Sequence, residues 1–185
     1  MRAVRCSRVV CLRQARAVLQ VGPGGTEIVN SVAERMVEEL DWPSYRVAMG
    51  PATTLGAALH GLLTSGNIDE ASAAWSEIEE HVFSQGTIYS AAEPTVSVML
   101  AALIEDQPSW RSGRILDLLF FIVRGVSATD SSLQGRCRDR AREGLWLLAR
   151  WALTHEGWAR DNALEVIEVI APDRVELMRS AIAEH

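Results

Sequence analysis

The sequence predicts an all-α protein of about eight or nine short antiparallel helices. Apolar residues recur at the three- and four-residue spacing of helices, and turns rich in Gly, Pro and Ser separate the apolar segments. Helix-capping residues precede several segments, and no segment alternates apolar and polar residues as a half-buried strand does. So many short helices without a sustained heptad favour stacked antiparallel pairs, an α-solenoid, over a four-helix bundle or coiled coil.

The length of 185 residues predicts one main domain with a basic segment before it. Residues 1–25 contain five arginines and no acidic residue, and we expect a docked amphipathic helix or a frayed segment there. Residues 26–185 are expected to form the helical domain. The Gly22-Pro23-Gly24-Gly25 sequence between them is interpreted as a hinge, because no strand precedes it as in a phosphate-binding loop.

Turn and capping signals place the individual helices. Thr26, or a capping box of Ser31 and Glu34, begins the first helix, whose inward residues include Val32 and Met36. A capping box of Asn67 with Glu70 begins another, whose inward residues are expected to include Ile68. The expected helices after the first one span approximately residues 51–64, 67–83, 93–104, 110–123, 131–154, 158–170 and 172–185.

Two of these segments need a specific argument. The apolar run 115–123 is interpreted as a buried helix, because its length and the lack of a second strand to pair with argue against a strand. The segment 131–154 is expected to be the longest helix, with an inward stripe that includes Cys137, Leu145 and Leu148.

Composition excludes several classes of function. All eighteen basic residues are arginine, so a Schiff-base lysine and the lysines of P-loops and protein kinases are absent. The net charge of −6 argues against nucleic-acid binding, which needs a broad basic surface. Three cysteines, Cys6, Cys11 and Cys137, match neither a closed disulfide set nor a zinc site, which predicts a reduced, cytoplasmic protein. No apolar run is long enough to span a membrane.

Residues that could carry chemistry are few, and no cofactor, metal or small-molecule ligand is indicated. Glu77 and His81 lie four residues apart. A solvated acidic helix face is a simpler interpretation of this spacing than a metal site. His60 is expected in the core or at its boundary. Cys137 lies on the inward stripe and is interpreted as an inert packing residue.

A segment in the middle of the chain resembles a known signature. Residues 80–92, Glu-His-Val-Phe-Ser-Gln-Gly-Thr-Ile-Tyr-Ser-Ala-Ala, resemble a sequence that recurs in bacterial HEAT-repeat-like proteins, in which a helix ends in His-Gln-Gly-Thr-Val-Tyr. The likeness extends over about residues 68–170. It departs at Ser84, where His is usual, and in the N-terminal sixty residues, which match no part of the signature. It implies a HEAT-like α-solenoid for residues 26–185, and such solenoids commonly bind proteins. Some members are DNA glycosylases or cofactor lyases.

The candidate binding residues lie late in the chain. Arginines at 136, 138, 140 and 142 form the densest basic run, and Trp146 is expected at the apolar edge beside Arg150. Arg and Trp are enriched where proteins bind one another tightly. We therefore predict a binding surface that consists of Arg136, Arg140, Trp146 and Arg150.

The sequence favours a non-enzymatic protein-binding solenoid, such as an inhibitor or immunity-type partner of another bacterial protein. The partner is not identified by any residue pattern. The alternative is an enzyme on the same scaffold, such as a DNA glycosylase or cofactor lyase, in which Asp117 within its apolar helix is the available carboxylate.

Overall fold

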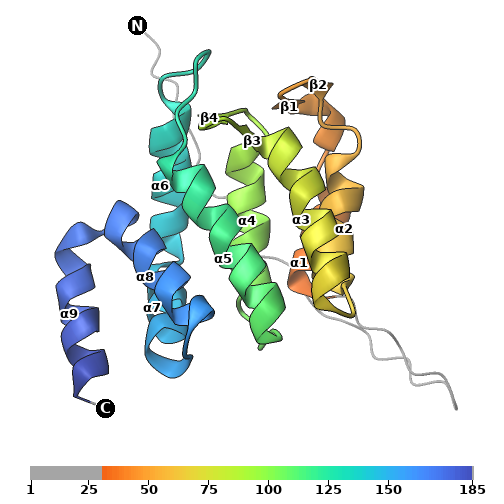
Figure 1. The fold of residues 1–185 in the computed structure, drawn as a ribbon. Helices are drawn as coiled ribbons and strands as arrows, with labels where there is room; N and C mark the ends of the chain where they lie inside the picture. The colour runs from red at the N-terminus through yellow and green to blue at the C-terminus, as the bar shows by residue number, and fades with distance from the viewer. Residues whose placement is uncertain (1–30, 185) are drawn as a thin grey trace, which may run out of the picture.

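The computed structural model describes residues 31–184, and these residues form an all-α domain (Figure 1). The expected helix at residues 1–25 and the Thr26 cap lie outside the described residues. The helices are α1 (Val32–Glu39), α2 (Leu55–Thr64), α3 (Ile68–Val82), α4 (Ala92–Ala102), α5 (Ser109–Arg124), α6 (Leu133–Glu143), α7 (Leu145–Thr154), α8 (Trp158–Ile170) and α9 (Pro172–Ala183), with a 3-10 turn at Trp42–Ser44. The all-α prediction is confirmed.

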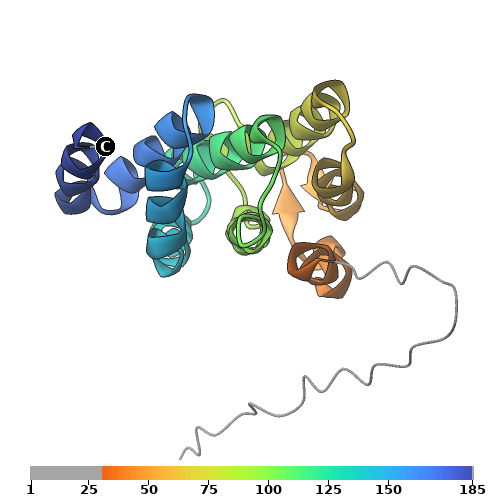
Figure 2. The ribbon, with the colours of Figure 1, turned by 90° about the horizontal axis from the view of Figure 1, so that it is seen from below.

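The helices lie in two rows (Figure 2). One row contains α1, α4 and the consecutive helices α6 and α7, and the other contains α3, α5 and α8. Helix α2 packs mainly against α3, and α9 packs against α7 and α8 at the C-terminal end. The central helices contribute much of the core, because α4 buries eight of its eleven residues and α5 eight of its sixteen. The HEAT-like solenoid stays a prediction.

Local capping explains where two of the helices begin. Ser31 accepts a hydrogen bond from the backbone N–H of Glu34, and the Glu34 carboxylate accepts one from the backbone N–H of Ser31 at 2.6 Å. This capping box fixes the start of α1. Asn67 caps α3 through the backbone N–H of Glu70, whose carboxylate in turn accepts from the N–H of Gly66.

The prediction of a single long helix at residues 131–154 is wrong, because the segment divides at Gly144 into α6 and α7. A Cβ atom at position 144 would lie 2.5 Å from Cδ2 of Leu100, so glycine lets the break pack directly against α4. The change of direction also moves Leu145 to a half-buried position, whereas Leu148 is fully buried.

Two short hairpins interrupt the helical pattern and were missed by the sequence analysis. Strands β1 (Arg46–Val47) and β2 (Gly50–Pro51) pair antiparallel, as do β3 (Phe83–Ser84) and β4 (Thr87–Ile88). The turn between β3 and β4 places Gln85 at φ 50° and Gly86 at φ 80°. Positive φ at both central residues is typical of a tight two-residue hairpin.

The side-chain orientation of three residues also differs from expectation. Val32 and Ile68 were expected to face inward, but they are 53% and 48% exposed. His60, expected in the core or at its boundary, is exposed. Within the part of the chain that the structure describes, no helix combines the length and apolar character needed to cross a membrane.

Candidate functional site

A groove runs along the outer face of α4, between α1 on one side and α6 and α7 on the other. It consists of two adjoining hollows of about 540 and 360 Å³ that share Met36, Ser97 and Arg140. The larger hollow is lined by Val32, Met36, Ser97, Leu100, Ala101, Ile104, Arg140, Glu143, Gly144 and Leu147. The smaller extends it past Leu40, Tyr45, Glu93 and Pro94. We call these two hollows together the α4 groove.

The apolar wall on α1 arises from residues that the sequence analysis assigned to the core. These residues are Val32 and Met36, which line the α4 groove. The residues of α1 that are buried in the core are Ala33 and Val37. At the far end, Ile104 is 57% exposed. Large apolar side chains therefore remain partly exposed at the edge of the groove.

Arg140 lies at the centre of the α4 groove, because it lines both hollows. Its guanidinium donates to the Glu143 carboxylate at 2.7 Å, one helical turn away on α6. Both side chains are well exposed, so this ion pair contributes little to stability and can be exchanged for a partner's carboxylate.

Arg136 borders the groove near the start of α4 but is held within the protein. Its Nε donates to Glu93 at 2.7 Å, and its Nη2 to Asp130 at 3.0 Å. Hydrogen bonds from Ser132 and from Arg136 lower the pKa of Asp130 to about 2. The Glu93 and Asp130 carboxylates in turn raise the pKa of Arg136. Arg136 therefore joins α6 to α4 and to the preceding loop.

Trp146 and Arg150 lie one turn apart on α7, beyond the other end of the groove. Trp146 is 78% exposed, which confirms its expected place at the surface. Arg150 donates to Asp106, in the loop after α4, at 2.7 Å. The residue after Trp146, Leu147, lines the larger hollow. Of the four predicted binding residues, Arg140 thus lines the α4 groove, whereas Arg136 lies near one end of it and Trp146 and Arg150 lie beyond the other end.

Sequence reasoning did not identify the remaining groove residues. The floor is provided by α4, with Ser97 and Ala101, and the opposite wall by Met36 of α1, about sixty residues earlier in the chain. Only spatial proximity brings these residues together with Arg140. Their apolar character was visible in the sequence, but it is equally typical of a core.

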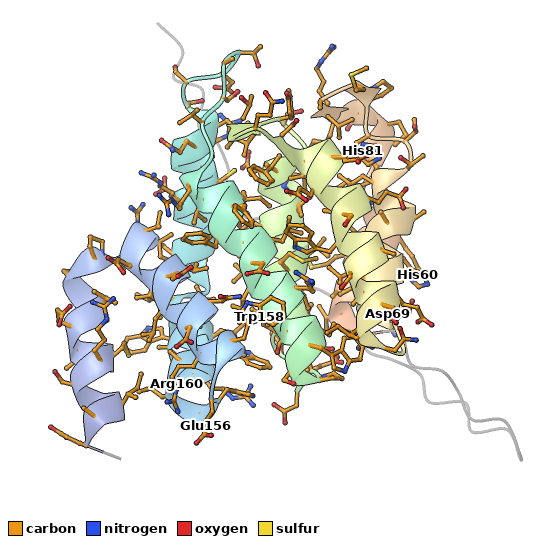
Figure 3. The ribbon with its side chains drawn as sticks, viewed as in Figure 1. His60, Asp69, His81, Glu156, Trp158 and Arg160 are labelled. Atoms are coloured by element: carbon orange, nitrogen blue, oxygen red, sulfur yellow. The ribbon has the colours of Figure 1, made fainter. Side chains whose placement is uncertain are left out.

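Other residues considered for chemistry are now located. Cys137 is fully buried, and burial raises the pKa of its thiol to about 12, so the thiol is unreactive. His81 contacts Thr54 at 3.0 Å, and Figure 3 shows it well separated from His60. Within residues 31–184, no group of three or more His, Cys, Asp and Glu side chains is arranged to hold a metal ion. Cys6, Cys11 and Gly22–Gly25 lie outside these residues.

Asp117, the carboxylate considered for an enzyme, lies on the opposite face of the molecule from α4. Asn162 of α8 donates to it at 2.6 Å, and Arg114 forms an ion pair with it at 3.5 Å. The Arg114 guanidinium lies between the rings of Trp75 and Trp158, 5.4 and 5.0 Å from their centroids. Figure 3 shows Trp158 between α8 and α5. These contacts join α3, α5 and α8 and hold Asp117 in place.

Burial raises the pKa of Asp117 above its ordinary value, although Arg114 and the hydrogen bonds from Trp158 and Asn162 oppose the shift; Glu165 adds to it. A raised pKa means that the folded state binds the proton more tightly than the unfolded state does. The stability that protonated Asp117 contributes is therefore complete below pH 3.8 and is lost as the pH rises through the folded-state pKa.

We expect Asp117→Asn to remove this pH dependence. The free energy of unfolding of the unmodified chain, relative to that of Asp117→Asn, should fall as the pH rises from about 4 to 7. Urea denaturation at several pH values measures both quantities. A relative stability that increases with pH would instead show that the Arg114 ion pair outweighs burial.

Comparison with known proteins found no family model, characterised protein or solved structure that matches the chain.

Proposed function

We propose that this chain is a non-enzymatic protein-binding module whose α4 groove receives an amphipathic helix of a partner protein. The observation that supports the proposal is the apolar lining of a surface groove of about 540 Å³, with Val32 and Ile104 more than half exposed at its edges. The bacterial origin, the cytoplasmic location and an inhibitor or immunity-type role belong to the same proposal.

The dimensions of the α4 groove fit a short helix. Eleven residues of α4 rise about 16 Å, which corresponds to about three turns of a partner helix lying along it. A helix of that length presents apolar side chains at positions i, i+3 or i+4, and i+7, and this pattern matches a groove with apolar floor and walls. Two adjoining hollows provide separate places for large side chains.

Charge sets the expected orientation of the partner. The α6–α7 wall carries Arg140 in the middle of the groove, with Arg136 and Arg150 toward its two ends. An acidic residue on the matching edge of the partner helix can pair with Arg140 when the exposed Glu143 moves aside. We therefore propose a partner helix with an apolar stripe and an acidic flank.

A peptide-display selection against the purified chain tests this function. We expect helical peptides of about fifteen residues to be enriched when they combine the apolar stripe with an acidic flank. Arg140→Glu and Trp146→Ala should each weaken binding of a selected peptide by at least ~1–2 kcal/mol in fluorescence anisotropy. The control Arg174→Glu on α9 should leave binding unchanged, because Arg174 pairs only with the neighbouring Asp173 at the surface.

A different result would move the binding surface elsewhere. If selected peptides lack the apolar stripe, or if both groove variants bind them normally while folded, the partner does not occupy the α4 groove. The exposed acidic row of α3, with Glu70, Glu77 and Glu80, would then be the next surface to test.

A further inference from the structure

A second concave region lies around the C-terminal end of α5, where α5 meets α6 and α8. One hollow of about 390 Å³ is lined by Phe120, Arg124, Arg138, Glu165, Glu168 and Val169. An adjoining hollow of about 320 Å³ is lined by Phe83, Gly86, Phe120, Phe121, Arg124 and Gly125. The two hollows share Phe120 and Arg124, so they form one site with a charged part and an aromatic part, each of a size typical for small ligands.

The charged part contains two arginines with guanidinium groups available to a ligand. Within residues 31–184, neither Arg124 nor Arg138 forms an ion pair, whereas seven other arginines do. The Arg124 guanidinium lies over the ring of Phe120, 5.0 Å from its centroid. Nε of Arg138 donates to the carbonyl of Val123 at 2.9 Å, which orients its terminal nitrogens. Two such guanidinium groups are suited to bind a carboxylate.

The same hollow also contains an available carboxylate. Glu168 is engaged by Arg179 at 3.1 Å, but Glu165 forms no ion pair among the described residues. A ligand that carried only negative charge would be repelled by Glu165, and one that carried only positive charge would be repelled by the two arginines. The charges together favour a ligand with a carboxylate and an ammonium group close to one another.

The aromatic part specifies the rest of the ligand. The rings of Phe83 and Phe121 are stacked with centroids 4.8 Å apart, and Phe120 meets Phe121 edge-on at 5.6 Å. Gly86 and Gly125 contribute no side chains to this hollow, which leaves its aromatic wall accessible. Aromatic walls prefer an aromatic ligand ring, because offset and edge-on contacts add to the burial of apolar surface.

We propose that this site binds a free α-amino acid with an aromatic side chain. Its carboxylate pairs with Arg124 and Arg138, its ammonium group pairs with Glu165, and its ring enters the hollow beside Phe121. Sequence reasoning indicated no small-molecule ligand, because these residues come from the β3–β4 hairpin, α5, α6 and α8 and share no motif. The inference is independent of the proposed partner helix, since the α4 groove contains none of these residues.

Calorimetric titration with four compounds tests the proposal. L-Phenylalanine should bind with a dissociation constant below about 1 mM. 3-Phenylpropionate lacks the ammonium group, 2-phenylethylamine lacks the carboxylate and L-alanine lacks the ring. Each should bind at least about tenfold more weakly than L-phenylalanine. Equal binding of 3-phenylpropionate and L-phenylalanine, or no binding of L-phenylalanine at millimolar concentration, would overturn the proposal.

Variants of Arg124 and Glu165 test which group of the ligand each of these two side chains binds. Arg124→Gln and Glu165→Gln should each weaken L-phenylalanine binding about tenfold. Glu165→Gln should also abolish the preference for L-phenylalanine over 3-phenylpropionate. The controls Arg35→Gln and Glu156→Gln change exposed residues outside the site and should leave the dissociation constant unchanged. Unchanged binding in both site variants, with normal melting curves, would contradict the assignment; if a variant does not fold, the four-compound series on the unmodified chain decides.

Discussion

Replacing Trp151 by alanine should lower the free energy of unfolding by ~3–5 kcal/mol, which is the range for truncating a fully buried tryptophan. The side chain has no exposed surface, and its Nε1 donates to the carbonyl of Leu103 at 2.9 Å. Its ring also stacks on His155, with centroids 3.8 Å apart. Truncation therefore leaves a large cavity and an unpaired carbonyl where α7 meets the end of α4.

Trp146→Ala is the matched control for this prediction. Trp146 lies on the same helix but is 78% exposed, so the free energy of unfolding should change by no more than ~0.5 kcal/mol. Urea denaturation of both variants measures the contrast. If Trp146→Ala destabilised the chain as much as Trp151→Ala, Trp146 would belong to the core, and the wall of the α4 groove would be wrongly placed.

Features that depend on neighbouring residues in the chain could be predicted from the sequence. The capping box at Ser31 needs only Glu34, and the cap at Asn67 needs only Glu70, so both helix starts follow from residues three apart. The run 115–123 was correctly interpreted as helix, because no second strand was available to pair with it. Cys137 also lies in the core, as its apolar stripe indicated.

Features that depend on contacts between distant segments could not be predicted. The close packing of Gly144 depends on Leu100, more than forty residues earlier, because a side chain at position 144 would meet that leucine. Helix α1 has eight residues, so its apolar pattern covers about two turns and does not distinguish Val32 from Ala33 as the inward residue. A short helix takes its orientation from its neighbours.

The candidate site likewise combines residues that the sequence identified with contacts that only the fold creates. Arg140 and Trp146 were identified by residue type and by their position on a late helix. The groove that gives Arg140 its significance requires α1 and α4, which contribute Met36 and Ser97. In the same way, the ion pair of Arg136 with Glu93 joins residues 43 positions apart, and the sequence alone does not reveal it. The sequence identified Arg140 on one wall, and the fold supplied the rest of the groove.

Filling the α4 groove should have the largest effect on binding. Ser97 lies half-buried on the outer face of α4 and lines both hollows. In Ser97→Trp, the indole should occupy the space that the partner's apolar side chains need. We expect the affinity for a groove-selected helical peptide to fall about a hundredfold, or ~2.7 kcal/mol. Fluorescence anisotropy with the labelled peptide measures this change.

The matched control is Ser180→Trp, which makes the same substitution at an exposed position of α9. Both variants place tryptophan in a helix, so any difference in helix propensity cancels in the comparison. Melting curves should be similar for the two variants, because neither serine is fully buried. Only Ser97→Trp should weaken the peptide. If Ser97→Trp is folded and binds the peptide as tightly as Ser180→Trp does, the helix cannot lie on α4, because the indole would leave it no room there.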